Sequence, residues 1–333
     1  MLFFFLSIFA LALALTIVLE KLAYRLYLID YPVARSAHTS PKPSGGGLVI
    51  AILFLSVAYL LKANDIVASN VFYALLSAGP VAAVGLFDDL SHVGLRFRLP
   101  TQFFAACWTV YYLGGVPSID FTFVQLSHSW ALNFLGIIAL VWLLNLYNFM
   151  DGIDAIAATE ALFVSLMLSF FAIYVGDDTL AFLAGALFAT SAGFLVWNWP
   201  PSKLFMGDVG SSFIGFILGG FALFSMHNGT MTVWTWFILL GVFVVDSTVT
   251  LLVRFIAGEK WYEGHSCHAY QNAARKLGSH ERVVIAILLI NLMWLAPLSW
   301  LSFLYPGLGF YICLVALVPI VYLCNKFKAG THD

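Results

Sequence analysis

Five aspartates in an otherwise apolar chain are the residues best suited to chemistry. Asp88 and Asp89 stand in "GLFDDLSH", Asp151 and Asp154 in "YNFMDGIDA", and Asp208 in "KLFMGDVGSS". At the centre of a bilayer each carboxylate would cost roughly 2.5–3.5 kcal/mol, so the five together would cost on the order of 12–18 kcal/mol. They are therefore expected to line a wet cavity or to meet cations.

A cluster of carboxylates with few neighbouring bases favours a divalent cation. Carboxylate oxygens and the amide oxygen of Asn148 suit Mg²⁺, which keeps several waters and bridges to substrate phosphates. In "GDVGSSF", Gly207 and Gly210 allow close backbone approach before an apolar run. The free N–H groups at such a helix start predict a bound phosphate, although Gly and Ser also serve ordinary helix starts.

The elements that must position these residues are membrane helices. Of 333 residues, 62% are hydrophobic and 10% are charged, too few charges for the surface of a soluble globule. The apolar runs predict an all-α polytopic integral membrane protein with about eleven transmembrane helices in a single domain, 1–333. The first run lacks a basic start and a cleavage site, so we expect a retained helix. The runs are 2–24, 45–61, 67–86, 99–114, 131–148, 154–175, 179–198, 211–226, 232–254, 283–302 and 307–325.

Charge predicts the orientation of these helices. When loops alternate between the two sides, fourteen basic residues fall on one side and only Lys62 on the other. Because basic residues gather on the cytoplasmic side, the N-terminus is predicted outside and the C-terminus inside. The five aspartates lie on the same cytoplasmic face. The fourteen are Lys21, Arg25, Arg35, Lys42, Arg96, Arg98, Lys203, Arg254, Lys260, Arg275, Lys276, Arg282, Lys326 and Lys328.

Other polar residues leave alternatives open. His265 and His268 in "GHSCHAYQ" could contact phosphate, hold zinc, or be solvated loop residues; no second ligand pair of suitable spacing supports zinc. Lys42 precedes a run of glycines that reads as a flexible entry into the next helix. Asp246 lies inside an apolar run, where an ionisable residue is either functional or paired with a neighbouring helix. The four cysteines imply no disulfide framework, and the absence of a basic arm predicts no nucleic-acid partner.

Taken together, these motifs resemble the polyprenyl-phosphate N-acetylhexosamine-1-phosphate transferases. The resemblance rests on "HTSPKPSGGG", "FDDL", "NLYNFMDGIDAIAA", "NWPPSKLFMGDVGSS" and "HSCHAYQ", in this order over nearly the whole chain. It implies transfer of an N-acetylhexosamine 1-phosphate from a UDP-sugar to undecaprenyl phosphate, releasing UMP, on the cytoplasmic face of a bacterial inner membrane. The segment "WYEGHSCHAYQ" is similar to the branch that starts O-antigen or related surface glycans.

The resemblance also implies roles for the reacting groups. Asp208 and Asn148 would hold Mg²⁺, with Mn²⁺ as the alternative metal, and Asp208 would be catalytic. Asp88 and Asp89 match the catalytic aspartate pair beside the acceptor phosphate. Asp88 is expected to orient the acceptor or to take a residual proton, because a phosphate monoester with a pKa near 6 is already largely ionised at pH 7.

Substrate contacts are implied in the same way. Asp154, Asn198 and Phe205 match the positions that recognise uracil, Phe205 by stacking. His265 and His268 match loop histidines that bind phosphate. Two further residues with implied substrate-side roles are Lys42, as a contact, and Asp151, as a supporting residue.

One departure from the family pattern concerns the backbone near the uracil positions. Ala155 follows Asp154 where glycine is common. Gly152 is expected to let the backbone approach the nucleotide. The donor sugar is left open among N-acetylglucosamine, N-acetylgalactosamine and their 6-deoxy relatives, and a homodimer is an expectation that no motif tests. The rival function is a cation-coupled transporter, which predicts acidic residues near mid-helix and internal repeats; here the acids crowd one face.

Overall fold

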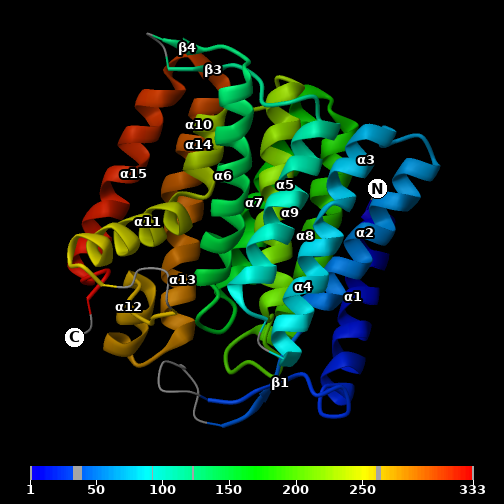
Figure 1. The fold of residues 1–333 in the computed structure, drawn as a ribbon, viewed down its shortest axis with the longest axis vertical. Coiled ribbons are helices and arrows are strands. Elements are labelled where there is room, and N and C mark those ends of the chain that lie inside the picture. Colours follow the sequence, from blue (N-terminus) through cyan, green and yellow to red (C-terminus); the bar gives the residue numbers. More distant parts are fainter. Residues whose placement is uncertain (1, 33–39, 92, 122–123, 260–263, 332–333) are drawn as a thin grey trace.

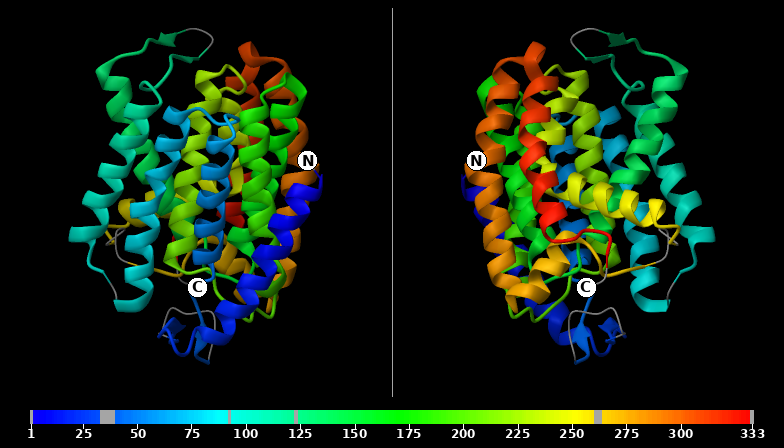
Figure 2. Two further views of the ribbon diagram at one scale, coloured as in Figure 1. Left: turned by 90° about the vertical axis from the view of Figure 1, so that its right-hand side faces the viewer. Right: turned by 90° about the vertical axis from the view of Figure 1, so that its left-hand side faces the viewer.

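The protein is a bundle of apolar helices with two short β-hairpins at opposite ends (Figures 1 and 2). The computed structural model describes residues 2–32, 40–91, 93–121, 124–259 and 264–331. Outside the described residues lie Arg35 and the residues 260–263, which include Lys260 and the first residues of the segment "WYEGHSCHAYQ". The all-α prediction holds in the described ranges, because only four two-residue strands accompany the helices.

Most neighbouring helices are joined by short connections, and the two longest connections carry the β-hairpins. Helix α9 (Asp208–His227) is the most buried of the described apolar helices, with 89% of its apolar stretch inside the protein, and helices from before and after it in the chain pack against it. The elements are α1 (Leu2–Leu22), β1 (Ile29–Asp30), β2 (Lys42–Pro43), α2 (Gly47–Ala63), α3 (Ser69–Leu76), α4 (Ala78–Ser91), α5 (Leu95–Tyr112), β3 (Ile119–Asp120), β4 (Gln125–Leu126), α6 (Trp130–Phe149), α7 (Ile156–Val175), α8 (Asp178–Asn198), α9 (Asp208–His227), α10 (Val233–Leu239), α11 (Gly241–Ile256), α12 (Ala269–Leu277), α13 (His280–Ile290), a π-helical turn (Asn291–Leu295), α14 (Ala296–Leu304), a 3₁₀ turn (Pro306–Leu308) and α15 (Gly309–Lys326).

All eleven predicted runs fall on helices, but not all of those helices have the length and apolarity of a membrane span. In the described part of the chain eight do, and α10 with α11 would make a ninth. Helix α2 has only 17 residues, and α5 carries Arg96 and Arg98 in its first turn. The polytopic membrane class is therefore supported, while the count of eleven and the orientation stay predictions.

The predicted span 232–254 is not one straight helix. Helices α10 and α11 are bent by 82° relative to each other, at Leu240. Helix α11 consequently lies across the bundle instead of along it (Figure 1). The bend brings Asp246 to the start of α12, where its carboxylate accepts hydrogen bonds from the backbone N–H groups of Ala269 and Tyr270, both at 2.9 Å.

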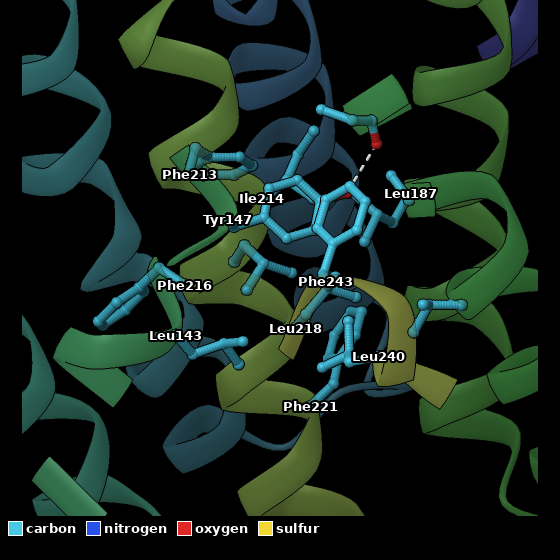
Figure 3. Close-up of a cluster of buried hydrophobic side chains, with 14 of the residues drawn as sticks. Leu143, Tyr147, Leu187, Phe213, Ile214, Phe216, Leu218, Phe221, Leu240 and Phe243 are labelled. Carbon is cyan, nitrogen blue, oxygen red and sulfur yellow. Dashed lines mark hydrogen bonds between the residues drawn. The ribbon is translucent and has the colours of Figure 1, made fainter. Parts of the chain in front are cut away.

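The core around α9 is built from aromatic and branched side chains. Figure 3 shows Phe213, Phe221, Tyr147 and Phe243 within one cluster of buried side chains, and the rings of Tyr147 and Phe243 are 5.0 Å apart. The hydroxyl of Tyr147 donates to the carbonyl of Ala157 at 2.7 Å, which satisfies a fully buried polar group. This contact joins the last turns of α6 to the first turn of α7, so the segment between them is held at both ends.

A second buried contact joins α7 to the C-terminal helices. Asn291, in the π-helical turn, donates to Oε2 of Glu160 at 2.6 Å, and neither side chain is more than 1% exposed. An ionisable group at this depth is costly unless it has a partner. The π-helical turn places Asn291 where it supplies that partner.

Candidate active site

The candidate site lies at the end of the bundle that carries β1 and α12, the lower end in Figure 1. Here α4 ends beside the start of α9. Oδ1 of Asp89 accepts the N–H of Asp208 at 2.8 Å, and Oδ2 accepts the N–H of Val209 at 3.1 Å. Gly207 has φ 75°, and a Cβ there would lie 2.5 Å from the Asp89 carboxylate, so only glycine fits the approach.

The prediction of a phosphate on the N–H groups at the start of α9 therefore needs correction. The first two of these groups donate to Asp89, and the next two, of Gly210 and Ser211, donate to the carbonyl of Gly207. A carboxylate from α4 supplies the anion that a helix N-terminus favours. Asp89 thus fixes the backbone position of Asp208.

Asp88 and Asp208 both pair with the same arginine side chain, that of Arg98. Nη1 of Arg98, on α5, lies 2.6 Å from Oδ2 of Asp88 and 3.0 Å from Oδ2 of Asp208. Nδ2 of Asn148, at the end of α6, donates to Oδ1 of Asp208 at 2.8 Å and to Ser211 Oγ at 2.9 Å. The structure thus brings together Asp88, Asp89, Asn148 and Asp208, which we call the acidic cluster.

The acidic cluster suits a divalent metal by charge and by donor type. Two of its three carboxylates, those of Asp88 and Asp208, pair with one guanidinium, so a dication would balance the negative charge that remains when all three are ionised. Among the described residues, no group of three or more His, Cys, Asp or Glu side chains forms a ready-made metal cage. The carboxylate oxygens of the acidic cluster and Oδ1 of Asn148 are donors of the type that Mg²⁺ prefers, and Mg²⁺ in proteins commonly takes one or two protein ligands and keeps several waters. Asn148 as placed presents its NH₂ group to Asp208, and its Oδ1 is the atom suited to a metal.

The residues predicted to recognise uracil form a second group, around Ser202. Oδ2 of Asp154 accepts the N–H of Ser202 at 3.1 Å. Asn198 is fully engaged inside the protein: Oδ1 accepts the N–H of Ala155 at 3.0 Å, and Nδ2 donates to the carbonyl of Leu204 at 3.0 Å. Asn198 therefore shapes the two loops, and Asp154 is the side chain of this pair that lines a cavity.

Ala155 adopts a conformation that usually belongs to glycine. Its φ is 68°, in the left-handed region, although its Cβ makes that region costly by about 1 kcal/mol. The N–H of Ala155 is held by Asn198, and its carbonyl begins α7 by accepting from Thr159 N at 2.9 Å. The position where the family pattern has glycine is thus a real left-handed turn.

Lys42 and Phe205 lie on the other side of Ser202. Nζ of Lys42 donates to the carbonyl of Ser202 at 3.1 Å and lies 5.1 Å from the centre of the Phe205 ring. The glycine run after Lys42 is not a loose entry, because Gly46 and Gly47 donate to the carbonyls of Phe205 and Met206. A flat ring with a cation beside it is a suitable platform for a nucleobase.

The loop between α6 and α7 links these groups. Burial raises the pKa of Asp151 well above its ordinary value, and the charges of Asp208, Asp89 and Asp154 add to the effect. Burial also acts to raise the pKa of Asp154, but bonds from His280 and Ser202 outweigh it and the pKa is lowered. Asp151 thus interacts electrostatically both with the acidic cluster and with Asp154, and its supporting role stays a prediction.

Gly152 was expected to approach a nucleotide. In the structure its close neighbours are on α12: a Cβ there would lie 2.2 Å from the hydroxyl of Tyr270 and 2.6 Å from Nε2 of Gln271. The hydroxyl of Tyr270 donates to the carbonyl of Phe149 at 3.0 Å. The glycine lets α12 dock against the loop.

The two predicted loop histidines lie together beside that contact. The rings of His265 and His268 are 4.8 Å apart, and each is within 6.5 Å of the Phe149 ring. Nδ1 of His268 lies 3.3 Å from Oδ1 of Asp246. Of the two alternatives for Asp246, a functional role or pairing with a neighbouring helix, the structure therefore shows the pairing. Phe149, whose ring both histidines approach, follows Asn148 of the acidic cluster directly in the chain.

A cavity of about 510 Å³ opens beside Asp154. Its walls are the loop at 153–154, the Pro200–Pro201 turn and the facing sides of α12 and α13. Polar side chains from the wall formed by α12 and α13 include Gln271, Arg275 and His280.

Two residues of the site, Arg98 and His280, were not predicted from the sequence. Arg98 had been counted only as a topogenic charge, and nothing in the sequence marks which loop aspartate His280 would meet.

Comparison with known proteins agrees with this geometry. Residues 71–226 match the model of glycosyl transferase family 4, a stretch that contains the acidic cluster and Asp154. A phospho-N-acetylmuramoyl-pentapeptide-transferase from Campylobacter lari is 30% identical over 257 residues, which is 67% of this chain and 70% of that protein. The chain belongs to glycosyl transferase family 4. The predicted family of membrane sugar-phosphate transferases is thereby confirmed.

Two other relatives in glycosyl transferase family 4 match more of the chain. A probable undecaprenyl-phosphate N-acetylglucosaminyl 1-phosphate transferase from Bacillus subtilis is 24% identical over 289 residues, 85% of this chain and 79% of that protein. An undecaprenyl-phosphate alpha-N-acetylglucosaminyl 1-phosphate transferase from Thermotoga maritima is 27% identical over 294 residues, 87% of this chain and 89% of that protein. All three relatives are bacterial, and none of them is a transporter.

Proposed function

We propose that this protein transfers an N-acetylhexosamine 1-phosphate from a UDP-sugar to undecaprenyl phosphate, with release of UMP. The observation that carries the proposal is the acidic cluster, where Asp88, Asp89 and Asp208 meet beside Asn148 at the same end of the bundle as the cavity. The names of the relatives supply the lipid phosphate and the sugar 1-phosphate. The cluster supplies the electrostatics that phosphoryl transfer needs.

The proposed reaction is a single displacement. An oxygen of the lipid phosphate attacks the β-phosphorus of the donor, the bond from that phosphorus to the bridging oxygen breaks, and UMP leaves with that oxygen. One pyrophosphate link is broken and one is formed, so no further energy source is needed. Mg²⁺, or Mn²⁺ in its place, would be held by Asp208 and Asn148, and it would neutralise the negative charge of the reacting phosphates.

The side chains have separate tasks in this scheme. Asp89 holds the start of α9 and with it Asp208. Arg98 is placed to draw phosphate oxygens toward Asp88 and Asp208, because a guanidinium that bridges two carboxylates keeps further N–H donors. Asp88 orients the acceptor or takes its residual proton. Phe205, Lys42 and Asp154 hold the nucleotide, and His265 with His268 contacts phosphate.

The distribution of basic residues supports a location for the protein and for its site. The fourteen-to-one distribution of basic residues supports a site on the cytoplasmic face of a bacterial inner membrane, where soluble UDP-sugars are present. The segment at 259–271 supports a role in starting O-antigen or a related surface glycan. A transporter is not favoured, because the acidic cluster lies at helix ends and holds a guanidinium.

The test is UMP release by the detergent-purified protein with undecaprenyl phosphate and Mg²⁺. UDP-N-acetylglucosamine is the first donor, followed by UDP-N-acetylgalactosamine and 6-deoxy donors. We expect release that needs the lipid, stops on chelation of the metal and is lost in Asp208→Asn. Arg282→Gln, an exposed change near the same end, is the control that should stay active. Folded protein that is silent with every donor would refute the proposal.

A further inference from the structure

His280 is a polar side chain of the cavity that has no role in the proposed reaction. It is the first residue of α13, and its side chain is 24% exposed. The cap of α13 is made by Ser279, whose hydroxyl accepts the N–H of Arg282 at 3.3 Å. The helix start therefore does not depend on the imidazole of His280.

The imidazole instead faces Asp154 from two directions. Nδ1 of His280 lies 3.4 Å from Oδ2 of Asp154 and 3.4 Å from the backbone nitrogen of the same residue. One ring nitrogen serves one of these contacts at a time: with a proton it donates to the carboxylate, and without a proton it accepts the N–H. In either state, Nδ1 is the atom that holds Asp154.

The neighbouring contacts explain why Asp154 needs this support. The next N–H along the chain, of Ala155, donates to Asn198, so two successive backbone groups are fixed by side chains from α13 and α8. Asp154 also accepts the N–H of Ser202, whose carbonyl accepts from Lys42. His280 is thus the link from this set of nucleotide-side residues to the opposite wall of the cavity.

We propose that His280 is a positioning residue for the donor nucleotide: through Nδ1 it fixes Asp154 in the wall of the 510 Å³ cavity, and so it sets the affinity for the uridine nucleotide and not the rate of transfer. This inference rests on the proposed function. Its chemistry is separate from the acidic cluster, since none of the hydrogen bonds or ion pairs described for His280 involves Asp88, Asp89 or Asp208.

Asn and Gln substitutions at position 280 distinguish a positioning role of the His280 side chain from a role in packing alone. Asn at 280 places an amide close to where Nδ1 stands, whereas Gln places its amide nearer to the position of Nε2. His280→Asn should therefore keep the contact with Asp154, and His280→Gln and His280→Ala should lose it. A role in packing alone would not distinguish Asn from Gln in this way.

The measurements are the affinity for UMP, by calorimetry in detergent with Mg²⁺, and steady-state kinetics with UDP-N-acetylglucosamine and undecaprenyl phosphate. For His280→Ala and His280→Gln we expect the dissociation constant of UMP and the KM of the donor to rise about 5- to 10-fold, the loss of one hydrogen bond. The kcat and the KM of the lipid should stay within about twofold, and His280→Asn should resemble wild type.

Three results would overturn the inference. They are an unchanged UMP affinity in His280→Gln, equal weakening in His280→Asn and His280→Gln, or a loss confined to kcat. Thermal melting shows which variants are folded, and Arg282→Gln controls for a change on the same helix turn. If the wild-type protein neither binds UMP nor turns over any donor, the proposed function fails and the inference falls with it; binding by wild type with no effect at His280 rejects the inference alone.

Discussion

Removing the carboxylate of Asp89 should destabilise the protein far more than removing its neighbour Asp88. Asp89 receives two backbone N–H groups of α9, at 2.8 and 3.1 Å. Hydrogen bonds to a charged acceptor are worth about 1.5–3 kcal/mol each, while the loss of a helix N-cap costs about 0.5–2 kcal/mol. Relief of repulsion with Asp208 offsets part of that loss. We expect Asp89→Ala to lower the free energy of unfolding by about 2 kcal/mol.

Asp88→Ala is the matched control. Its carboxylate caps no helix, its side chain is 14% exposed, and Arg98 keeps Asp208 as a partner when Asp88 is removed. A partly exposed pair of this kind is worth about 1 kcal/mol or less. Both variants should lose turnover, so stability is the property that separates the two aspartates.

The assay is chemical unfolding of both variants in mild detergent, followed by the fluorescence of the ten tryptophans. We expect the midpoint for Asp89→Ala to fall clearly below those of Asp88→Ala and wild type, and Asp89→Asn, which keeps one acceptor oxygen, to lie between. If Asp89→Ala and Asp88→Ala unfolded together at the wild-type midpoint, the assignment of Asp89 as the cap of α9 would be wrong.

The remaining predictions concern the loop after α6 and the buried pair beyond it. Because the pKa of Asp151 is raised above 3.8 by burial and by neighbouring carboxylates, its neutral form favours folding, so stability should fall as the pH rises above about 4; in metal-free unfolding, Asp151→Asn should flatten that fall. Ala155→Gly should stabilise by about 1 kcal/mol because φ is 68°, seen as a higher unfolding midpoint with turnover retained. Asn291→Leu should cost about 1–3 kcal/mol by leaving Glu160 without its donor, and adding Glu160→Leu should recover most of that loss in the same unfolding assay.

The sequence predicted the helices well because their apolar runs are long and bounded by polar segments. The run at 131–148, for example, differs from α6 by one residue at each end, and the run at 179–198 differs from α8 by one residue at its start. The prediction of a single helix over 232–254 was wrong in one respect. The hydropathy of this run shows nothing of the bend at Leu240, after which Asp246 meets the start of α12 through hydrogen bonds between residues far apart in the chain.

The candidate site was predictable in its residues and less so in their partners. The acidic residues stood out because charge in an apolar chain is costly. The cap by Asp89 could not be predicted, because its partner lies 119 positions away and any anion would suit the start of α9 equally well. Arg98 was hidden among residues whose charge serves membrane orientation. The contact of His280 with Asp154 joins segments 126 positions apart and leaves no local pattern.

The division of the site between two parts of the chain bears on how the donor is selected. The acidic cluster lies within the 71–226 stretch that matches the family, and it would act on phosphates that every donor shares. The opposite wall of the cavity, formed by α12 and the start of α13, lies outside that stretch. Two polar contacts, His280 with Asp154 and Asn291 with Glu160, fasten α13 to the loop and helix that follow the cluster. Under the proposed function, changes in the far wall would alter which sugar fits without disturbing the acidic cluster. Substitutions at Gln271 and Arg275 should then change the preference among UDP-sugars more than the rate with the best of them.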